Sequence, residues 1–392
     1  MARKVAFVGG GVIGLASAWR MASRGWGVTV IDPTPGRGAS WVAAGMIAPL
    51  GEAEHSETAI TRLRIAGAGW WPDFAADLVR TTGMDIGYSM TGSIMVAVDS
   101  SDQLVVEDLA SLHHDLGYAV KHLSASACRA LVPSLSPGIR GGVELPDDHH
   151  VDNRRLVEAL IESCTNVSVS FVRDRVARVV FGHDGAVRGA FLGSGELVDA
   201  DVVVMTAGAE CGAIGGVPVE ASPDVRPVMG QVLRLRPTPG SPDVARTIRG
   251  VVHGRPCYIV PRADGSVVVG ATSEERGFET TVRAGAVHGL LDDARTLVPG
   301  IDEFELAECS VGLRPASPDN GPIVGWTGAP GLAVATGHYR NGILLTPITA
   351  HAVECLLTGD PLPDALLPFD FFRPGAARGR ARSRSDVART GA

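Results

Sequence analysis

Lysine is almost absent from this chain of 392 residues: Lys4 and Lys121 are the only two, and arginine carries nearly all the positive charge. Acidic residues exceed basic ones by 43 to 35, which gives a formal net charge of −8. A protein that mainly holds nucleic acid needs a basic face, so this balance argues against that class. No apolar run approaches the roughly 18 residues of a transmembrane helix, and glycines interrupt the apolar run near the N-terminus too early for a signal peptide. We therefore expect neither nucleic acid nor a membrane as a partner.

Cysteine is scarce and follows no metal-binding or redox pattern. The six cysteines are widely spaced and form no C-x-x-C pair, so we expect reduced thiols and a cytoplasmic location. The motifs of serine hydrolases, zinc proteases and P-loop proteins are also missing. The stretch 147–152 holds several acidic residues and histidines, but neighbouring residues of a strand point to opposite faces and cannot all reach one ion. We therefore expect no metal site.

The clearest motif lies at the start of the chain. Residues 4–8 (KVAFV) are typical of a strand buried on both faces, and G-x-G-x-x-G follows at Gly9, Gly11 and Gly14 before an apolar stretch typical of a helix. In such a unit the glycines allow a tight turn, a close approach of the backbone to a pyrophosphate, and close packing of helix on sheet. A second predicted strand ends at Asp32, whose carboxylate suits the hydroxyls of a ribose. The motif predicts binding of NAD or FAD rather than NADP.

The segment after Asp32 favours FAD over NAD. An NAD-binding fold usually continues into another helix and strand, whereas residues 33–49 are rich in glycine and alanine. Backbone with such small side chains can lie against a large, flat cofactor.

The rest of the chain alternates between two kinds of pattern. β-α-β patterns recur near the middle and the end. Helices are predicted over 55–80, 101–117 and from Arg154, where Asp152 or Asn153 can act as N-cap, and a hairpin is predicted at Asp264-Gly265. We expect an α/β (α+β) fold in which a Rossmann-like FAD-binding domain is interleaved with an antiparallel-sheet substrate domain. The expected parts are 1–50, 141–220 and 310–372 for the first domain, 51–140 and 221–309 for the second, and a disordered basic tail over 373–392.

Four segments together resemble the FAD-dependent glycine oxidases of thiamine biosynthesis (the ThiO type), within the D-amino-acid oxidase superfamily. The segments are VGGGVIG, ASWVAAGMIAP, CYIVPRADGSVVVGAT, and GLRPASPDNGPIVG followed by ATGHYRNGILLTP. The likeness extends from about residue 4 to residue 371, and the last two segments are the most specific. Glycine-motif segments like the first occur in many unrelated flavin and nicotinamide proteins.

The resemblance implies a set of binding residues. Beside Gly9, Gly11 and Gly14, the implied flavin contacts are Val12, Ile13, Asp32, Pro33, Ala39, Ser40, Ala44, Gly45, Met46, a backbone contact to adenine at Val176, and His338, Tyr339, Arg340, Asn341, Gly342, Ile343 and Leu344. The implied substrate contacts are Tyr258, Arg314 and Arg340, since an amino-acid carboxylate suits the rigid donor fork of arginine. No side chain is expected as a catalytic acid or base, because the flavin carries the chemistry. FAD is expected to bind without a covalent bond, because GLRPASPDN contains no cysteine.

Two positions depart from the resembled enzymes. Arg255-Pro256 stands where they can carry a histidine near the active site, and Ser273 where they can carry a methionine, and both places are expected to line the pocket. The cofactor is thus better specified than the amine.

The resemblance implies oxidative deamination of glycine, other small amines or D-amino acids, with hydride transfer from Cα to flavin N5. Dioxygen would be reduced to hydrogen peroxide, and the imine would give glyoxylate and ammonia or enter the thiazole of thiamine. A sarcosine or D-amino-acid oxidase, a quinone-reducing dehydrogenase and a non-catalytic FAD-binding module are the alternatives. We also expect a homo-oligomer.

Overall fold

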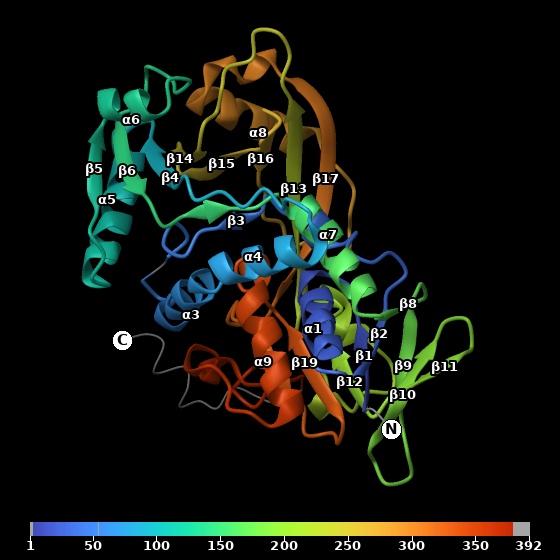
Figure 1. Ribbon diagram of the computed structural model, residues 1–392. Helices are drawn as coiled ribbons and strands as arrows, with labels where there is room; N and C mark the ends of the chain where they lie inside the picture. The colour runs from blue at the N-terminus through green and yellow to red at the C-terminus, as the bar shows by residue number, and fades with distance from the viewer. Residues whose placement is uncertain (1–2, 54, 379–392) are drawn as a thin grey trace.

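Six strands form a mostly parallel sheet in the lower half of Figure 1. The structure is a computed structural model, and it describes residues 3–53 and 55–378. The strand order is β18-β19-β12-β1-β2-β8, and within this sheet β18 alone runs antiparallel to its neighbour. The bounds are β1 (Lys4–Val8), β2 (Gly27–Ile31), β8 (Ser170–Val172), β12 (Val202–Met205), β18 (Ile323–Trp326) and β19 (Leu332–Thr336). Parallel strands buried on both faces read as continuous apolar runs, which explains KVAFV.

Alternate residues of β1 supply two different cores. Val5 and Phe7 pack with α1 (Val12–Ser23), α7 (Asn153–Asn166) and α9 (Thr346–Thr358), whereas Ala6 and Val8 face the small sheet β11-β10-β9. The strands of the small sheet are β9 (Val176–Phe181), β10 (Val187–Leu192) and β11 (Leu197–Asp199). The period of two therefore places a helical layer on one face and a β layer on the other.

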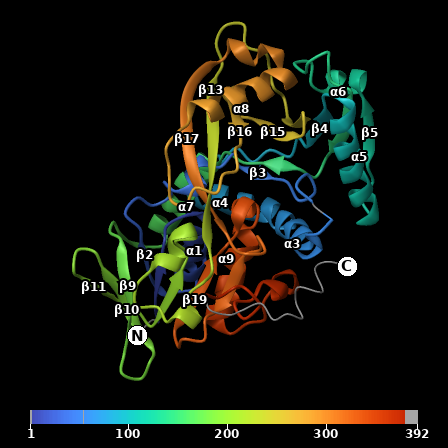
Figure 2. The same ribbon diagram turned by 180° about the vertical axis from the view of Figure 1, so that it is seen from behind.

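A second sheet of eight strands fills the upper half of Figure 1, in the order β17-β13-β16-β15-β14-β4-β6-β5. It is antiparallel except for the pair β14–β4. The bounds are β4 (Ser93–Ala97), β5 (Lys121–Ser124), β6 (Gly141–Leu145), β13 (Arg226–Arg236), β14 (Thr247–Val252), β15 (Arg255–Pro261), β16 (Val267–Gly270) and β17 (Glu305–Ala316). Its outer face packs on α6 (Ala125–Leu131) and α8 (Ala284–Leu297), and its other face turns toward the first sheet (Figure 2).

The remaining elements connect these layers. They are α2 (Ala39–Val42), β3 (Met46–Ile47), α3 (Thr58–Gly69), α4 (Trp71–Thr82), α5 (Ser100–Asp115), β7 (His149–His150), η1 (Gly208–Ala213), η2 (Val219–Ala221), η3 (Pro299–Glu303), η4 (Tyr339–Asn341) and η5 (Asp364–Phe369). No helix among the described residues is both long and apolar enough to cross a membrane.

The expected fold class is confirmed, and so are several local predictions. Asp152 caps α7, with its carboxylate accepting from the backbone of the first turn, and Asp264-Gly265 joins the antiparallel pair β15–β16. The helix predicted over 55–80 is two helices, because Pro72 begins a new helix directly after the break at Trp70.

The sheets divide the chain at other points than those expected. β6 belongs to the eight-stranded sheet, although residues from 141 onward were assigned to the other domain. Leu63 of α3 and Trp71 of α4 pack with Phe7 of the six-stranded sheet, although 51–140 was assigned to the substrate domain. Periodicity reveals each element but not the partner against which it packs.

The expectation of a disordered tail over 373–392 is wrong at its start. Arg373 forms an ion pair with Asp319 (Nε–Oδ2 2.9 Å), and Ala376 and Ala377 are only 1% and 2% exposed. Small side chains fill a gap on the folded body without showing any apolar period. The remainder of the tail lies outside the described residues.

Candidate active site

A cavity of about 1260 Å³ lies between the two sheets. Its walls come from both sheets, from the segment after β2 and from the turn before α9. The volume exceeds the usual range of small-molecule pockets and suits a dinucleotide together with a small substrate.

The glycine motif forms one end of this cavity. A Cβ on Gly9, whose φ is +111°, would lie 2.5 Å from Ala207 Cα, and a Cβ on Gly14 would lie 2.0 Å from the Gly9 carbonyl oxygen. These two glycines let α1 and β12 close around the turn. A Cβ on Gly11 would meet only Ser40 Oγ, at 3.2 Å, because this position opens to the cavity. Gly11 has no side chain with which to cap α1, and only the Val12 N–H has a side-chain acceptor described in the first turn, Ser40 Oγ at 3.1 Å, so the positive end of the helix is suited to an anion.

Asp32 directly follows β2 and lies beside this turn. One carboxylate oxygen accepts from the Gly10 N–H (2.7 Å) and the other from the Thr34 N–H (2.8 Å). Because Asp32 also lines the cavity, it both holds the glycine turn and offers an acceptor to a ligand.

A cluster of buried polar side chains holds the segment 40–46 against the cavity. The Asn153 amide donates to the carbonyls of Ser40 (2.8 Å) and Trp41 (2.9 Å). Arg234 donates to Trp41 and Ala43 and Arg262 to Ala44, and burial lowers the pKa of both guanidiniums, that of Arg234 to about 10. Nothing in the sequence indicates that these three residues support the loop. Asn153, for example, is equally explained as a helix residue near the N-cap.

The turn before α9 forms the wall near the other end. Tyr339 has a φ of +49°, and the buried His338 contacts the Thr349 hydroxyl through Nε2 at 3.0 Å. Burial lowers the pKa of His338 to about 3, so this ring is neutral at pH 7. Arg64 of α3 donates from Nε to Asn341 Oδ1 at 3.0 Å, which fixes the turn from outside.

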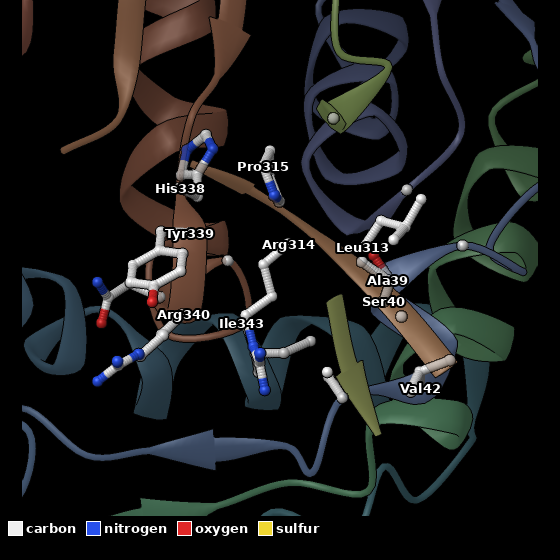
Figure 3. A pocket seen from close by; sticks show the side chains of 18 of the residues that line it. Ala39, Ser40, Val42, Leu313, Arg314, Pro315, His338, Tyr339, Arg340 and Ile343 are labelled. Atoms are coloured by element: carbon white, nitrogen blue, oxygen red, sulfur yellow. The ribbon is translucent and has the colours of Figure 1, made fainter. Parts of the chain in front are cut away.

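Arg314 projects from β17 into the cavity (Figure 3). Its guanidinium lies flat on Gly230 of β13, where a Cβ would come within 2.4 Å of Nη1 and 2.5 Å of Nη2. Nη1 donates to the Thr272 carbonyl at 3.0 Å, which leaves further donors of the fork for a ligand.

Tyr258 reaches the same region from β15. Its ring crosses Gly270, where a Cβ would lie 2.4 Å from the hydroxyl oxygen. Burial raises the pKa of Tyr258 to about 12, so the hydroxyl keeps its proton and can donate it to an acceptor. Arg340 lines the cavity from η4, with its guanidinium 4.9 Å from the ring centre of Tyr339 (Figure 3).

The cavity thus has a dinucleotide-binding end and an arginine-lined end. The chain matches the family model "DAO: FAD dependent oxidoreductase" over residues 4–356. The chain belongs to this FAD-dependent oxidoreductase family. The first relatives include the bifunctional protein ThiO/ThiG of Nostoc sp., 32% identical over 92% of this chain and 54% of the relative. The chain therefore spans about half the length of these bifunctional relatives.

Other members of the family match over their whole length. The glycine oxidase of Pseudomonas putida is 31% identical over 93% of this chain and 98% of its own. The crystal structure of glycine oxidase from Geobacillus kaustophilus has a TM-score of 0.85 and 30% identity, covering 95% of this chain and 99% of that one. Iminodiacetate oxidase from Chelativorans sp. BNC1 has a TM-score of 0.80 and 26% identity, covering 94% and 98%.

The features of the cavity fit the family's cofactor. The N-terminus of α1, the Gly11 position open to the cavity and the acceptor at Asp32 suit the pyrophosphate and ribose of FAD. The segment 40–46 and the turn 338–344 offer walls for the remainder.

The cavity brings together nearly all residues that the sequence singled out. Those that line it are Gly9, Gly11, Val12, Ile13, Asp32, Pro33, Ala39, Ser40, Ala44, Gly45, Met46, Val176, Tyr258, Arg314, His338, Tyr339, Arg340, Asn341, Gly342, Ile343 and Leu344. Gly14 is not part of the wall and acts through packing behind the turn. Pro256 and Ser273 also line the cavity, whereas the neighbouring Arg255 does not. Glu52 and Arg249 line it too, although nothing in the sequence indicates either.

Proposed function

We propose that this chain oxidises glycine and other small amines or D-amino acids with bound FAD and dioxygen. The observation that carries the proposal is the pair Arg314 and Tyr258, which project into the cavity whose other end carries the glycine motif. The relatives named glycine oxidase, which match over nearly their full length, support it. A role in thiamine synthesis rests on the match to the ThiO/ThiG protein of Nostoc sp., and the chain covers only 54% of that relative.

Arg314 and Tyr258 would hold the substrate carboxylate. The guanidinium supplies charge-assisted donors in a fixed plane, and the Tyr258 hydroxyl adds a neutral donor because its pKa is about 12. Arg340 lines the cavity from η4 and adds a second cation. Held in this way, the substrate would keep its Cα in one orientation, which is the main contribution of protein side chains in such an enzyme.

The cofactor would be held by the glycine turn, Asp32, and the segments 39–46 and 338–344. Bound FAD supplies the two-electron oxidation of the amine, and the resulting imine would give glyoxylate and ammonia or a precursor of a thiazole. No cysteine is among the described residues that line the cavity, which supports attachment without a covalent bond. Acid treatment should release FAD into the supernatant, and flavin that stays with the precipitated chain would contradict this.

An anaerobic titration of the flavin absorbance tests the function. Glycine, sarcosine, D-alanine and D-proline are added in turn, and at least one should bleach the flavin. In Arg314→Ala the same bleaching should need a much higher amine concentration, and Arg314→Lys should recover part of the loss. A flavin that none of these amines reduces would contradict the proposal and favour a non-catalytic binding module.

Exposure of the reduced protein to air distinguishes an oxidase from a dehydrogenase. An oxidase should give about one hydrogen peroxide for each flavin reoxidised. A low peroxide yield with normal bleaching would favour a dehydrogenase that uses another acceptor. The homo-oligomer and the cytoplasmic location stay predictions from the sequence.

A further inference from the structure

Besides Arg314 and Arg340, the guanidinium of Arg249 faces the substrate end of the cavity. Arg249 of β14 lies directly opposite Tyr258 of β15, and directly opposite residues of paired strands send their side chains to the same face. Met95 of β4, on the other side of Arg249, also lines the cavity. In the strand order, Arg249 and Arg314 therefore lie on opposite sides of Tyr258.

The Arg249 guanidinium is buried but poorly partnered. Its side chain is 11% exposed, and its Nε has no hydrogen-bond partner within the described part of the chain. Nη1 points at the Met46 sulfur at 3.4 Å, a weak acceptor, and Nη2 lies 3.5 Å from Glu52 Oε1. A buried cation normally has strong acceptors around it, so this one has capacity for another.

The chain around Arg249 leaves room for this side chain. A Cβ on Gly51 would lie 3.1 Å from Arg249 Nε and 2.3 Å from Asp148 Oδ2. Asp148 itself is occupied, since it accepts from the Ser93 hydroxyl (2.9 Å) and the Gly51 N–H (3.3 Å). The cation is therefore held in place without being saturated.

Other buried arginines of the molecule differ in this respect. The Nε atoms of Arg234 and Arg262 also lack a hydrogen-bond partner within the described part of the chain. Both side chains, however, donate to backbone carbonyls of the segment 41–44, and neither lines the cavity. Their role is accounted for by the loop that they hold. Arg249, by contrast, contacts the Met46 sulfur and the Glu52 carboxylate, and it faces the ligand space.

We propose that Arg249 is a specificity-determining residue that binds a second acidic group of the amine substrate. The inference rests on the proposed function, in which Arg314 and Tyr258 hold the first carboxylate. A carboxylate on the amine nitrogen or on the α-carbon substituent would then meet the Arg249 fork on the far side of Tyr258. Glu52, 3.5 Å away, holds the fork loosely and competes with that group. The preferred substrate class is thus amino diacids rather than amines with apolar substituents.

Two secondary amines of matched shape test the proposal. Iminodiacetate carries a second carboxylate, and N-isobutylglycine replaces it with an uncharged branch of similar size. Binding of each to the FAD-loaded protein is measured by calorimetry, and kcat/KM by flavin reduction. The wild-type protein should prefer iminodiacetate, and Arg249→Met should reduce the ratio of the two affinities by about tenfold or more, as expected for loss of a charge-assisted hydrogen bond.

Three further variants sharpen the outcome. Arg249→Lys should keep part of the preference, because the charge remains while the fork is lost. Glu52→Gln should raise the preference for the diacid, because it removes the competing carboxylate, and this variant does not depend on whether Arg249→Met folds. Arg246→Met is the matched control: Arg246 pairs with Glu144 (3.1 Å) just before β14 and does not line the cavity, so the ratio should not change.

Failure of the inference and failure of the function give different results. If amines reduce the flavin but the wild type shows no preference for iminodiacetate, or Arg249→Met and Glu52→Gln leave the affinity ratio unchanged, the inference is overturned. If no amine reduces the flavin, the proposed oxidase activity fails. The calorimetric ratio still decides, in that case, whether Arg249 binds the second acid.

Discussion

Gly230→Ala should separate substrate binding from folding more cleanly than removal of any polar group. The added Cβ would lie 2.4 Å from Nη1, 2.5 Å from Nη2 and 2.6 Å from Cζ of Arg314. These atoms are the far end of a flexible side chain, so the guanidinium moves while the strands stay in place. The φ of Gly230 is outside the left-handed region, so alanine fits the backbone of β13.

The size of the effect follows from the displacement. Ordinary contacts of a Cβ start near 3.4 Å, so the guanidinium must retreat by about 1 Å, enough to break at least one charge-assisted hydrogen bond to a carboxylate. Such a bond contributes about 1.5–3 kcal/mol, which corresponds to a decrease of roughly 10- to 150-fold in kcat/KM for glycine. The free energy of unfolding should change by less than about 1 kcal/mol, because the substitution also restricts the unfolded chain.

The assay is steady-state peroxide formation from glycine, with flavin content and melting temperature measured on the same preparations. Gly289→Ala in α8 is the matched control, because a Cβ there has no atom within 4 Å and should leave kcat/KM unchanged. A normal kcat/KM in Gly230→Ala would refute the assignment of Arg314 as the carboxylate anchor. A loss of flavin or a large fall in melting temperature would refute the reasoning that only the side chain moves.

Other parts of the molecule give predictions of different kinds. Gly11→Leu should purify without FAD, measured by the ratio of flavin to protein absorbance, because the new side chain fills the space open to the cavity, and a yellow variant would contradict this. Burial and the nearby Arg262 charge lower the pKa of His150 to about 4. The free energy of unfolding should therefore fall by about 3 kcal/mol as pH falls from 6.5 to 4, and denaturation of His150→Gln at both pH values should show a smaller loss. A chain that ends at residue 372 should melt several degrees lower than one that ends at 378, because it lacks Arg373 and the buried Ala376 and Ala377, and equal melting temperatures would show that these contacts contribute nothing.

The sequence predicted best where the local chain carries the whole signal. The turn from β1 to α1 is specified by five neighbouring residues and three glycines. The structure agrees with the predicted roles of Gly9 in the tight turn and Gly14 in close packing, and the role of Gly11 toward a pyrophosphate stays a prediction. The resemblance added Arg314 and Tyr258, whose distant segments do meet in one cavity.

The sequence predicted least where the role of a residue depends on register between strands. Arg249 becomes a residue of the cavity only because β14 pairs with β15 so that positions 249 and 258 are opposite. A shift of one residue would turn its side chain to the other face. The same limit explains β6, because residues 141–145 carry no signal for which of the two sheets accepts them.

Glycines shape the substrate end as much as the polar residues do. Arg314 lies on Gly230, Tyr258 lies across Gly270, and Arg249 passes Gly51, and at each glycine a Cβ would lie within about 3 Å of the polar side chain. The cavity wall is therefore hollowed next to each donor, at two positions of the sheet and at one in the segment after β3, and the long side chains lie down in the hollows instead of blocking the cavity. Because each donor is positioned by a neighbour without a side chain, selectivity can change through the glycine as readily as through the donor. Gly270→Ala should accordingly weaken glycine binding through Tyr258, with a smaller effect than Gly230→Ala because a neutral hydroxyl contributes less than a guanidinium.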